Sequence, residues 1–269
     1  MIFFSGWGYF SISKLAKDKN AYDWNYLYYE DISYSSIEMA LKAIYVHLKG
    51  CFEEIRSQYA ALNDSNIGIS DFMRNFKPSS FRKDSAWNYR TSVSHELQKI
   101  FPQLNADFMI TIKPRIDPGL ARNGDRVIGI EMPFEKVIDG TYNVSLQHEV
   151  QHIKHGDSGG TGVDSEDGII STINYMLDGN EIAAYAKQFA YQYYKQFPND
   201  AVLDFNKLVQ TFGSDIKLAN YVKFLNNAQD IVNRRPELRE YPDIISRMVA
   251  GGNQFKSSVV EFFGYYKQG

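Results

Sequence analysis

The sequence predicts a mixed α+β fold that is mainly helical, with a small antiparallel sheet of about three strands. Apolar residues recur at three- and four-residue intervals over residues 35–61, which is the period of a helix with one buried face, and the chain after Pro198 also looks helical. Between these parts, residues 108–113 and 126–132 are rich in β-branched and large apolar side chains. That composition favours strands, so sheet and helices are expected in different parts of the chain.

The composition is typical of a globular protein, with 44% hydrophobic and 23% charged residues. A net charge of −3 argues against a dedicated nucleic-acid-binding surface. The single cysteine, Cys51, excludes an internal disulfide and lies in an apolar helical stripe, where we expect a buried side chain. Neither a basic, apolar leader nor an apolar run of membrane-spanning length is present. We therefore expect a soluble protein of a reducing cytoplasm.

Residues 1–104 are expected to form an aromatic-rich and helical N-terminal region. Its first part, 1–31, is dense in tyrosine and predicts an irregular or strand-bearing lead segment. Residues 35–61 predict an amphipathic helix, in which His47 is interpreted as a structural or surface histidine. Residues 63–90 predict a loop anchored by its aromatic side chains, and residues 91–101 a short helix.

Residues 105–197 are expected to form the core of the protein. Two strands, 108–113 and 126–132, are joined by a long loop rich in turn residues. A helix is predicted to start between Tyr142 and Ser145, with Thr141 or Asn143 as its N-cap, and to end at Gly156. The next elements are residues 169–177, which fit a strand or a helix, and a strongly helical segment from Asn180 to about Gln196.

Residues 198–269 predict a C-terminal helical region that forms one compact unit with the core. Its prolines place a loop at residues 233–242. The expected helices are 200–212, 214–228, about 241–250 and 253–266.

The run His148-Glu149-Val150-Gln151-His152 carries the strongest functional signal. Residues four apart lie on one face of a helix, so both imidazoles can bind the same zinc ion. The carboxylate of Glu149 can hold and deprotonate the attacking water. The alternative is an amphipathic helix whose polar face is only solvated.

A catalytic zinc ion takes a third protein ligand, and Glu181 is the candidate. It lies on the first turn of the helix expected from Asn180, where an acidic residue is also favourable to the helix dipole alone. His155, one turn after His152, and Asp157 and Asp164, in a glycine-rich loop, are rival ligands. The metzincin pattern fails, because His155 and a serine occupy its glycine and third-histidine positions.

His148-Glu149-x-x-His152 followed by Glu181-x-x-Ala184 resembles the gluzincin branch of the zincin metallopeptidases. The resemblance covers residues 125–197. It implies that His148, His152 and Glu181 hold Zn²⁺, and that Glu149 is the general base in hydrolysis of a peptide or protein substrate.

The resemblance also implies a zincin-like sheet packed on the metal-binding helix. In zincins an edge strand just before that helix holds the substrate backbone, and residues 126–132 are our candidate for it. Thermolysin-like enzymes carry an aspartate four residues after the ligand glutamate, whereas this chain has Tyr185 there. The residue that stabilises the oxyanion is not identified by the motif.

Two further functions remain open at this point. The chain fits a structural or interaction protein, for example a component of a viral particle, with a vestigial or structural metal helix; its 19 tyrosines suit a large contact surface. The metal also fits hydrolysis of something other than a peptide, because the motif fixes the attacking water and not the substrate. Metal analysis separates the structural alternative from the enzyme.

Overall fold

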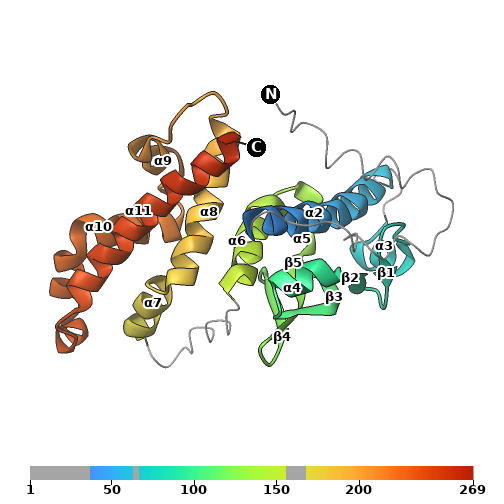
Figure 1. Cartoon of the computed structure of the whole chain (residues 1–269), viewed down its shortest axis with the longest axis horizontal. Helices are drawn as coiled ribbons and strands as arrows, with labels where there is room; N and C mark the ends of the chain where they lie inside the picture. Colours follow the sequence, from blue (N-terminus) through green and yellow to red (C-terminus); the bar gives the residue numbers. More distant parts are fainter. Residues whose placement is uncertain (1–36, 63–66, 156–167, 269) are drawn as a thin grey trace. The chain divides into compact units, whose positions relative to one another are not determined.

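The computed structural model describes residues 37–62, 67–155 and 168–268. The chain divides into two compact units, Met1–Ser158 and Gly159–Gly269. The first contains helices α2 to α6 and five strands, and the second contains helices α7 to α11 (Figure 1). The described residues are mostly helical with one small sheet, which confirms the α+β class. The boundary between the two units falls inside residues 105–197, which the sequence predicted to be a single core. The predicted lead segment, residues 1–31, lies outside the described residues.

Helix α2 (Ile37–Ala61) matches the amphipathic helix expected over residues 35–61. Its buried face follows the predicted three- and four-residue spacing, with the exception of Ile37, which is exposed. The helix packs on α5 and α6 within the first unit. The buried residues are Ala40, Leu41, Ile44, His47, Leu48, Cys51, Phe52 and Ile55.

The expectation of a loop over residues 63–90 is wrong in part. This segment contains α3 (Ile69–Asn75), β1 (Arg82–Lys83) and the start of β2 (Asn88–Ser92). These elements are too short for a periodic apolar pattern, and β1 exists only by pairing with β2. The expected anchoring is present, since the aromatic rings of Phe76 and Phe81 are buried.

The short helix expected over residues 91–101 is present as α4 (His95–Ile100). The hydroxyl of Ser94 accepts a hydrogen bond of 3.3 Å from the backbone N–H of Leu97 and so caps the helix. This side-chain cap explains why the helix starts one residue after Ser94.

The sheet is mixed and five-stranded, which corrects the expectation of about three antiparallel strands. Its order is β1-β2-β3-β5-β4. Strands β3 (Leu104–Lys113) and β5 (Arg126–Pro133) run parallel, and every other pair is antiparallel. Strand order along the chain does not reveal which neighbours pair, so the parallel pair was not visible in the sequence.

The predicted loop between residues 113 and 126 contains another strand, β4 (Gly119–Asn123). This strand forms a hairpin with β5 and places β5 between β3 and β4. Residues 126–132 are therefore not an edge strand, contrary to expectation. Within the described residues, β4 and β1 are the two edges of the sheet.

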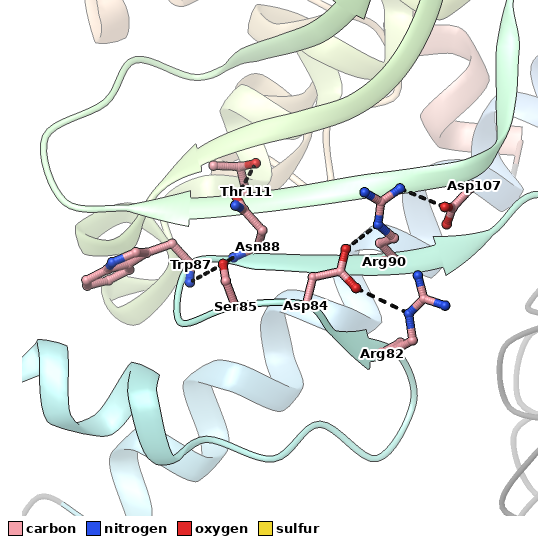
Figure 2. Close-up of polar contacts among 8 residues, drawn as sticks. All are labelled: Arg82, Asp84, Ser85, Trp87, Asn88, Arg90, Asp107 and Thr111. Carbon is pink, nitrogen blue, oxygen red and sulfur yellow. Dashed lines mark hydrogen bonds and ion pairs between the residues drawn. The ribbon is translucent and has the colours of Figure 1, made fainter.

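A row of charged side chains crosses β1, β2 and β3 (Figure 2). Arg82 and Arg90 are direct cross-strand neighbours, and like charges in such positions repel. The carboxylate of Asp84 accepts hydrogen bonds from both guanidinium groups, and Asp107 accepts a second one from Arg90 at 2.6 Å. The two acids offset the repulsion. A further hydrogen bond of 3.0 Å, from Thr111 to the side chain of Asn88, ties β3 to β2.

The sheet leads directly into the helices that carry the motif. Strand β5 ends at Pro133, and α5 (Phe134–Asp139) begins at the next residue. Helix α5 ends at Gly140 in the left-handed conformation, with φ of 80°, and α6 (Tyr142–His155) begins two residues later. Thr141 precedes α6 as expected, but its hydroxyl donates to the carboxylate of Asp139 at 2.6 Å instead of capping. The predicted end at Gly156 lies outside the described residues.

The second unit consists of helices. Residues 169–177, left open between strand and helix, belong to α7, and the predicted Glu181 helix is α8. Helix α11 packs on both α8 and α10 (Figure 1). The elements are α7 (Gly168–Met176), α8 (Gly179–Gln196), α9 (Phe205–Phe212), α10 (Ile216–Arg234), η2 (Pro236–Glu240) and α11 (Ile244–Gln268). None of the described helices is both long and apolar enough to cross a membrane.

Two expected boundaries in the second unit are wrong. Helix α9 begins at residue 205, later than predicted, because the carboxylate of Asp204 accepts from the N–H groups of Asn206 and Lys207 at 2.9 and 3.3 Å. Helix α10 continues to Arg234 and passes through a non-helical residue, Asn227.

The two helices expected at 241–250 and 253–266 are one helix, α11. Gly251 and Gly252, which separate the two expected ranges, lie inside it. A Cβ at Gly251 would lie 2.4 Å from the side chain of Leu177, and one at Gly252 would lie 2.8 Å from the backbone N of Leu225. At Gly252 the backbone of another helix, α10, approaches α11 too closely for a Cβ, whereas at Gly251 the neighbour is the end of a side chain.

Candidate metal centre

The buried apolar face of α6 determines which side of the helix carries the two motif histidines. Tyr142, Leu146, Val150 and Ile153 are fully buried in the core of the first unit. The ring of Tyr142 packs edge-on against Phe52 of α2, with centroids 5.1 Å apart. Consecutive residues of a helix are turned by about 100°, so His148, two residues after Leu146, lies on a different side of α6 from this apolar face.

His148 and His152 form a close pair on consecutive turns of α6. Their Nε2 atoms lie 3.0 Å apart, and their ring centroids 4.8 Å apart with the rings at 74°. Two ligands bound tetrahedrally at 2.0–2.1 Å are about 3.3 Å apart. The same nitrogen of each ring therefore faces a common point at close to the separation that one metal ion needs.

Glu181 lies on the first turn of α8, and the structure of that turn defines its position. The carboxylate of Asp178 accepts from the N–H groups of Asn180 and Glu181 at 2.8 and 3.4 Å, so α8 begins just before Glu181. The side chain of Glu181 is buried, with 6% of its surface exposed. The N-terminal end of a helix favours negative charge, so the position suits a carboxylate.

The three predicted ligands form one group of side chains that could hold a metal ion. His148, His152 and Glu181 are all buried, each offers one ligand atom, and these atoms lie within 4.8 Å of one another. Two imidazole nitrogens and one carboxylate oxygen are the donor set of the His₂Glu type of catalytic zinc site. This buried group is suited to hold a metal ion.

The other sequence candidates are placed as follows. Glu149, the predicted general base, is buried beside His148 in α6. His155 is the last residue of α6, and its side chain lies outside the described part of the structure. Asp157 and Asp164 also lie outside the described residues.

Two tyrosines next to Glu181 were missed as functional candidates. Burial, with smaller contributions from the neighbouring Tyr185 and Glu181 side chains, raises the pKa of Tyr175 in α7. The sequence held a signal for Tyr185, which lies one turn after Glu181 on the same face of α8. It held none for Tyr175, because the secondary structure of residues 169–177 was open.

His47 is a structural histidine remote in sequence from the motif. Its Nε2 lies 3.0 Å from the hydroxyl of Thr91 on β2, and it joins α2 to the sheet. Burial lowers the pKa of His47 to about 3, so the ring is neutral at ordinary pH. Nearby, burial raises the pKa of the Cys51 thiol, which makes it a poor nucleophile, as expected for a buried small side chain.

Comparison with models of protein families, with curated proteins and with solved structures gave no match to this chain. The resemblance to zincins therefore stands on the motif residues alone.

Proposed function

We propose that the protein is a zinc-dependent metallopeptidase of the zincin type. The single observation that carries the proposal is the buried group of His148, His152 and Glu181, whose ligand atoms lie within 4.8 Å of one another. The group combines a sequence motif with a third ligand from another helix, as a catalytic zinc site requires. Zinc is the metal proposed, because His₂Glu ligation suits this borderline-soft ion better than Mg²⁺ or Ca²⁺, which prefer oxygen ligands.

His148, His152 and Glu181 would hold the ion, and water or substrate could bind it as well. When bound, zinc supplies a Lewis acid that polarises the substrate carbonyl and lowers the pKa of water. Glu149 accepts the proton of the attacking water at its carboxylate. It then donates that proton to the amine nitrogen of the leaving peptide. Its burial, with 8% of its surface exposed, keeps bulk water from competing for this proton transfer.

The edge strand β4 supports a peptide as the substrate. In the described residues it pairs on one side only, with β5, so its outer side offers backbone N–H and C=O groups to an extended chain. We propose that β4, in place of residues 126–132, pairs with the substrate backbone. An extended peptide is the substrate that such an edge is suited to bind.

Metal analysis and a peptidase assay test the proposal together. We expect about one zinc ion per purified chain by mass spectrometry of metals, and cleavage of fluorescent casein or of a quenched peptide library. A chelator should abolish cleavage, and added Zn²⁺ should restore it. A chain without zinc would refute the proposal. Stoichiometric zinc without cleavage of any peptide would instead indicate a structural metal helix or a different substrate.

A further inference from the structure

A lysine of α5 is held against the first turn of α6, just before the motif. The ammonium nitrogen of Lys136 donates a hydrogen bond of 2.7 Å to the hydroxyl oxygen of Ser145. Lys136 is half-buried, and Ser145 is buried. The hydrogen bond spans the turn at Gly140, so it brings a positive charge from α5 to the side of α6 that carries Ser145.

Ser145 lies on the same side of α6 as the first half of the motif. It precedes His148 by three residues and Glu149 by four, and residues at these spacings are neighbours on a helix surface. The rise of about 1.5 Å per residue places them about 4.5–6 Å apart along the helix axis. Helical side chains lean towards the N-terminal end, so those of His148 and Glu149 lean towards the turn of Ser145. The ammonium group of Lys136 is therefore about one helical turn from Glu149, the proposed general base.

The ammonium group of Lys136 has no acidic partner within the described part of the chain. Its hydrogen-bond partner there is a neutral hydroxyl. By contrast, Lys99, Lys154 and Lys207 each pair with a carboxylate, at 2.6, 2.8 and 2.8 Å. An ammonium group has three N–H donors, so two of those of Lys136 remain for water or for a ligand. Lys136 is thus a half-buried cation beside the motif that is not neutralised by a described side chain.

A link between α5 and α6 does not by itself explain this charge, because α5 is anchored in other ways. Val137 is fully buried in the same core as Leu146 of α6. The backbone carbonyl of Ile138 accepts a hydrogen bond of 3.2 Å from Arg56 of α2. A neutral donor would link the helices as well, and burial of an ammonium group costs free energy unless an anion accompanies it. An anionic ligand at Lys136 would offset that cost.

We propose that Lys136 is a specificity-determining residue that binds a carboxylate of the substrate peptide. This inference rests on the proposed peptidase function and adds the class of substrate, a peptide with a negative charge close to the cleaved bond. Ser145 positions the ammonium group, whose other N–H groups donate to the carboxylate oxygens. Hydrogen bonds of this charged kind are about twice as strong as those between neutral groups. A flexible lysine accepts a C-terminal carboxylate or an acidic side chain alike, and the test separates these two sources.

Matched peptides test this specificity. A peptide that the wild-type protein cleaves is made with a C-terminal carboxylate or amide, and with glutamate or glutamine beside the cleaved bond. We expect kcat/KM to be about 10–100-fold higher for a charged form than for its neutral match, the range for a hydrogen bond to a charged group. The pair of peptides that shows the difference identifies the source of the carboxylate. In Lys136→Met the ratio of the two kcat/KM values should fall to within about threefold of one.

Peptide binding without turnover gives a second readout. In a Glu149→Gln background the peptides should stay intact, and fluorescence anisotropy measures their Kd. The charged form should bind about 10–100-fold more tightly than the neutral form, and addition of Lys136→Met should remove this difference.

Two further variants separate charge from packing. Lys136→Arg keeps the positive charge and should keep most of the preference for the charged peptide. Lys113→Met removes an exposed lysine from the end of β3, opposite Pro133 at the start of α5, and should leave the ratio at its wild-type value. Circular dichroism verifies that each variant is folded. Equal losses for both peptides in Lys136→Met, or the same change of ratio in Lys113→Met, would overturn the role of Lys136.

The failure of this inference and that of the proposed function give different results. If the wild-type protein cleaves peptides but does not distinguish the charged from the neutral forms, the peptidase function stands and the role of Lys136 is refuted. If the wild-type protein cleaves no peptide, both are refuted.

Discussion

The Nε2 atoms of His148 and His152 lie 3.0 Å apart on consecutive turns of α6, so each ring is placed to complete a metal site with the other. We expect His152→Ala to weaken Zn²⁺ binding by more than about 100-fold, since loss of a direct ligand costs more than loss of its hydrogen-bond partner. Competition with a chelator measures this change. His95→Ala is the matched control, because His95 is exposed at the start of α4, and it should bind zinc as the wild type does.

Glu149→Gln separates metal binding from catalysis. The substitution keeps the size of the side chain but removes the group that accepts a proton. We expect zinc content to stay at the wild-type level and kcat for peptide hydrolysis to fall by about 10²–10⁴-fold or more, the range for loss of a general base. Full activity in this variant would show that the assigned mechanism is wrong.

Acid should weaken the fold through His47. Its pKa is about 3 in the folded protein and 6.5 in the unfolded chain, because burial disfavours the charged ring. The folded-state pKa is lowered, so the stabilisation is fully present above pH 6.5 and is lost as the pH falls from 6.5 towards 3. Between pH 7.5 and 5.0 the linkage amounts to about 2 kcal/mol of unfolding free energy.

Urea unfolding of the zinc-free protein at the two pH values measures this linkage. His47→Gln removes the titrating group, so its loss of stability between pH 7.5 and 5.0 should be smaller by the same amount of about 2 kcal/mol. An identical pH dependence in the wild type and in His47→Gln would contradict the assignment.

The glycines of α11 make a stability test with an internal control. An added Cβ at Gly252 would meet the backbone of Leu225 at 2.8 Å, so Gly252→Ala should destabilise the protein by about 1–3 kcal/mol. No atom lies within 4 Å of a Cβ at Gly264 in the same helix. Gly264→Ala should therefore stabilise by about 0.5–1 kcal/mol, because alanine is the better helix former. Thermal unfolding reports both changes, and the same sign for both would refute the close contact.

Local patterns predicted the parts of the fold that depend on neighbouring residues in sequence. The period of apolar residues is enough to define α2, and the spacing of His148 and His152 is enough to place both rings on one side of α6. The pairing of β3 with β5 depends on a strand, β4, that forms only as the partner of β5, and no local pattern reports this. The position of Gly251 and Gly252 inside α11 is likewise not reported by a local pattern, since their close neighbours are Leu177 and Leu225.

The same division holds for the candidate site. His148, Glu149 and His152 belong to one motif, and Glu181 followed from the need for a third ligand on a nearby helix. Tyr175 could not be predicted as a neighbour of Glu181, because the two residues come close only once the turn between α7 and α8 is formed.

The direct passage from Pro133 into α5 sets a limit on insertions during evolution. An extra residue in the surface segment 114–118 would only lengthen the connection between two strands. An extra residue in α6 between Leu146 and His148 would turn both imidazoles by about 100° relative to the buried Tyr142 and Leu146. No loop separates β5 from α5, so an inserted residue could not be accommodated there. Relatives of this chain should therefore vary in length in the segment before β4 and keep a constant length from β5 to His152.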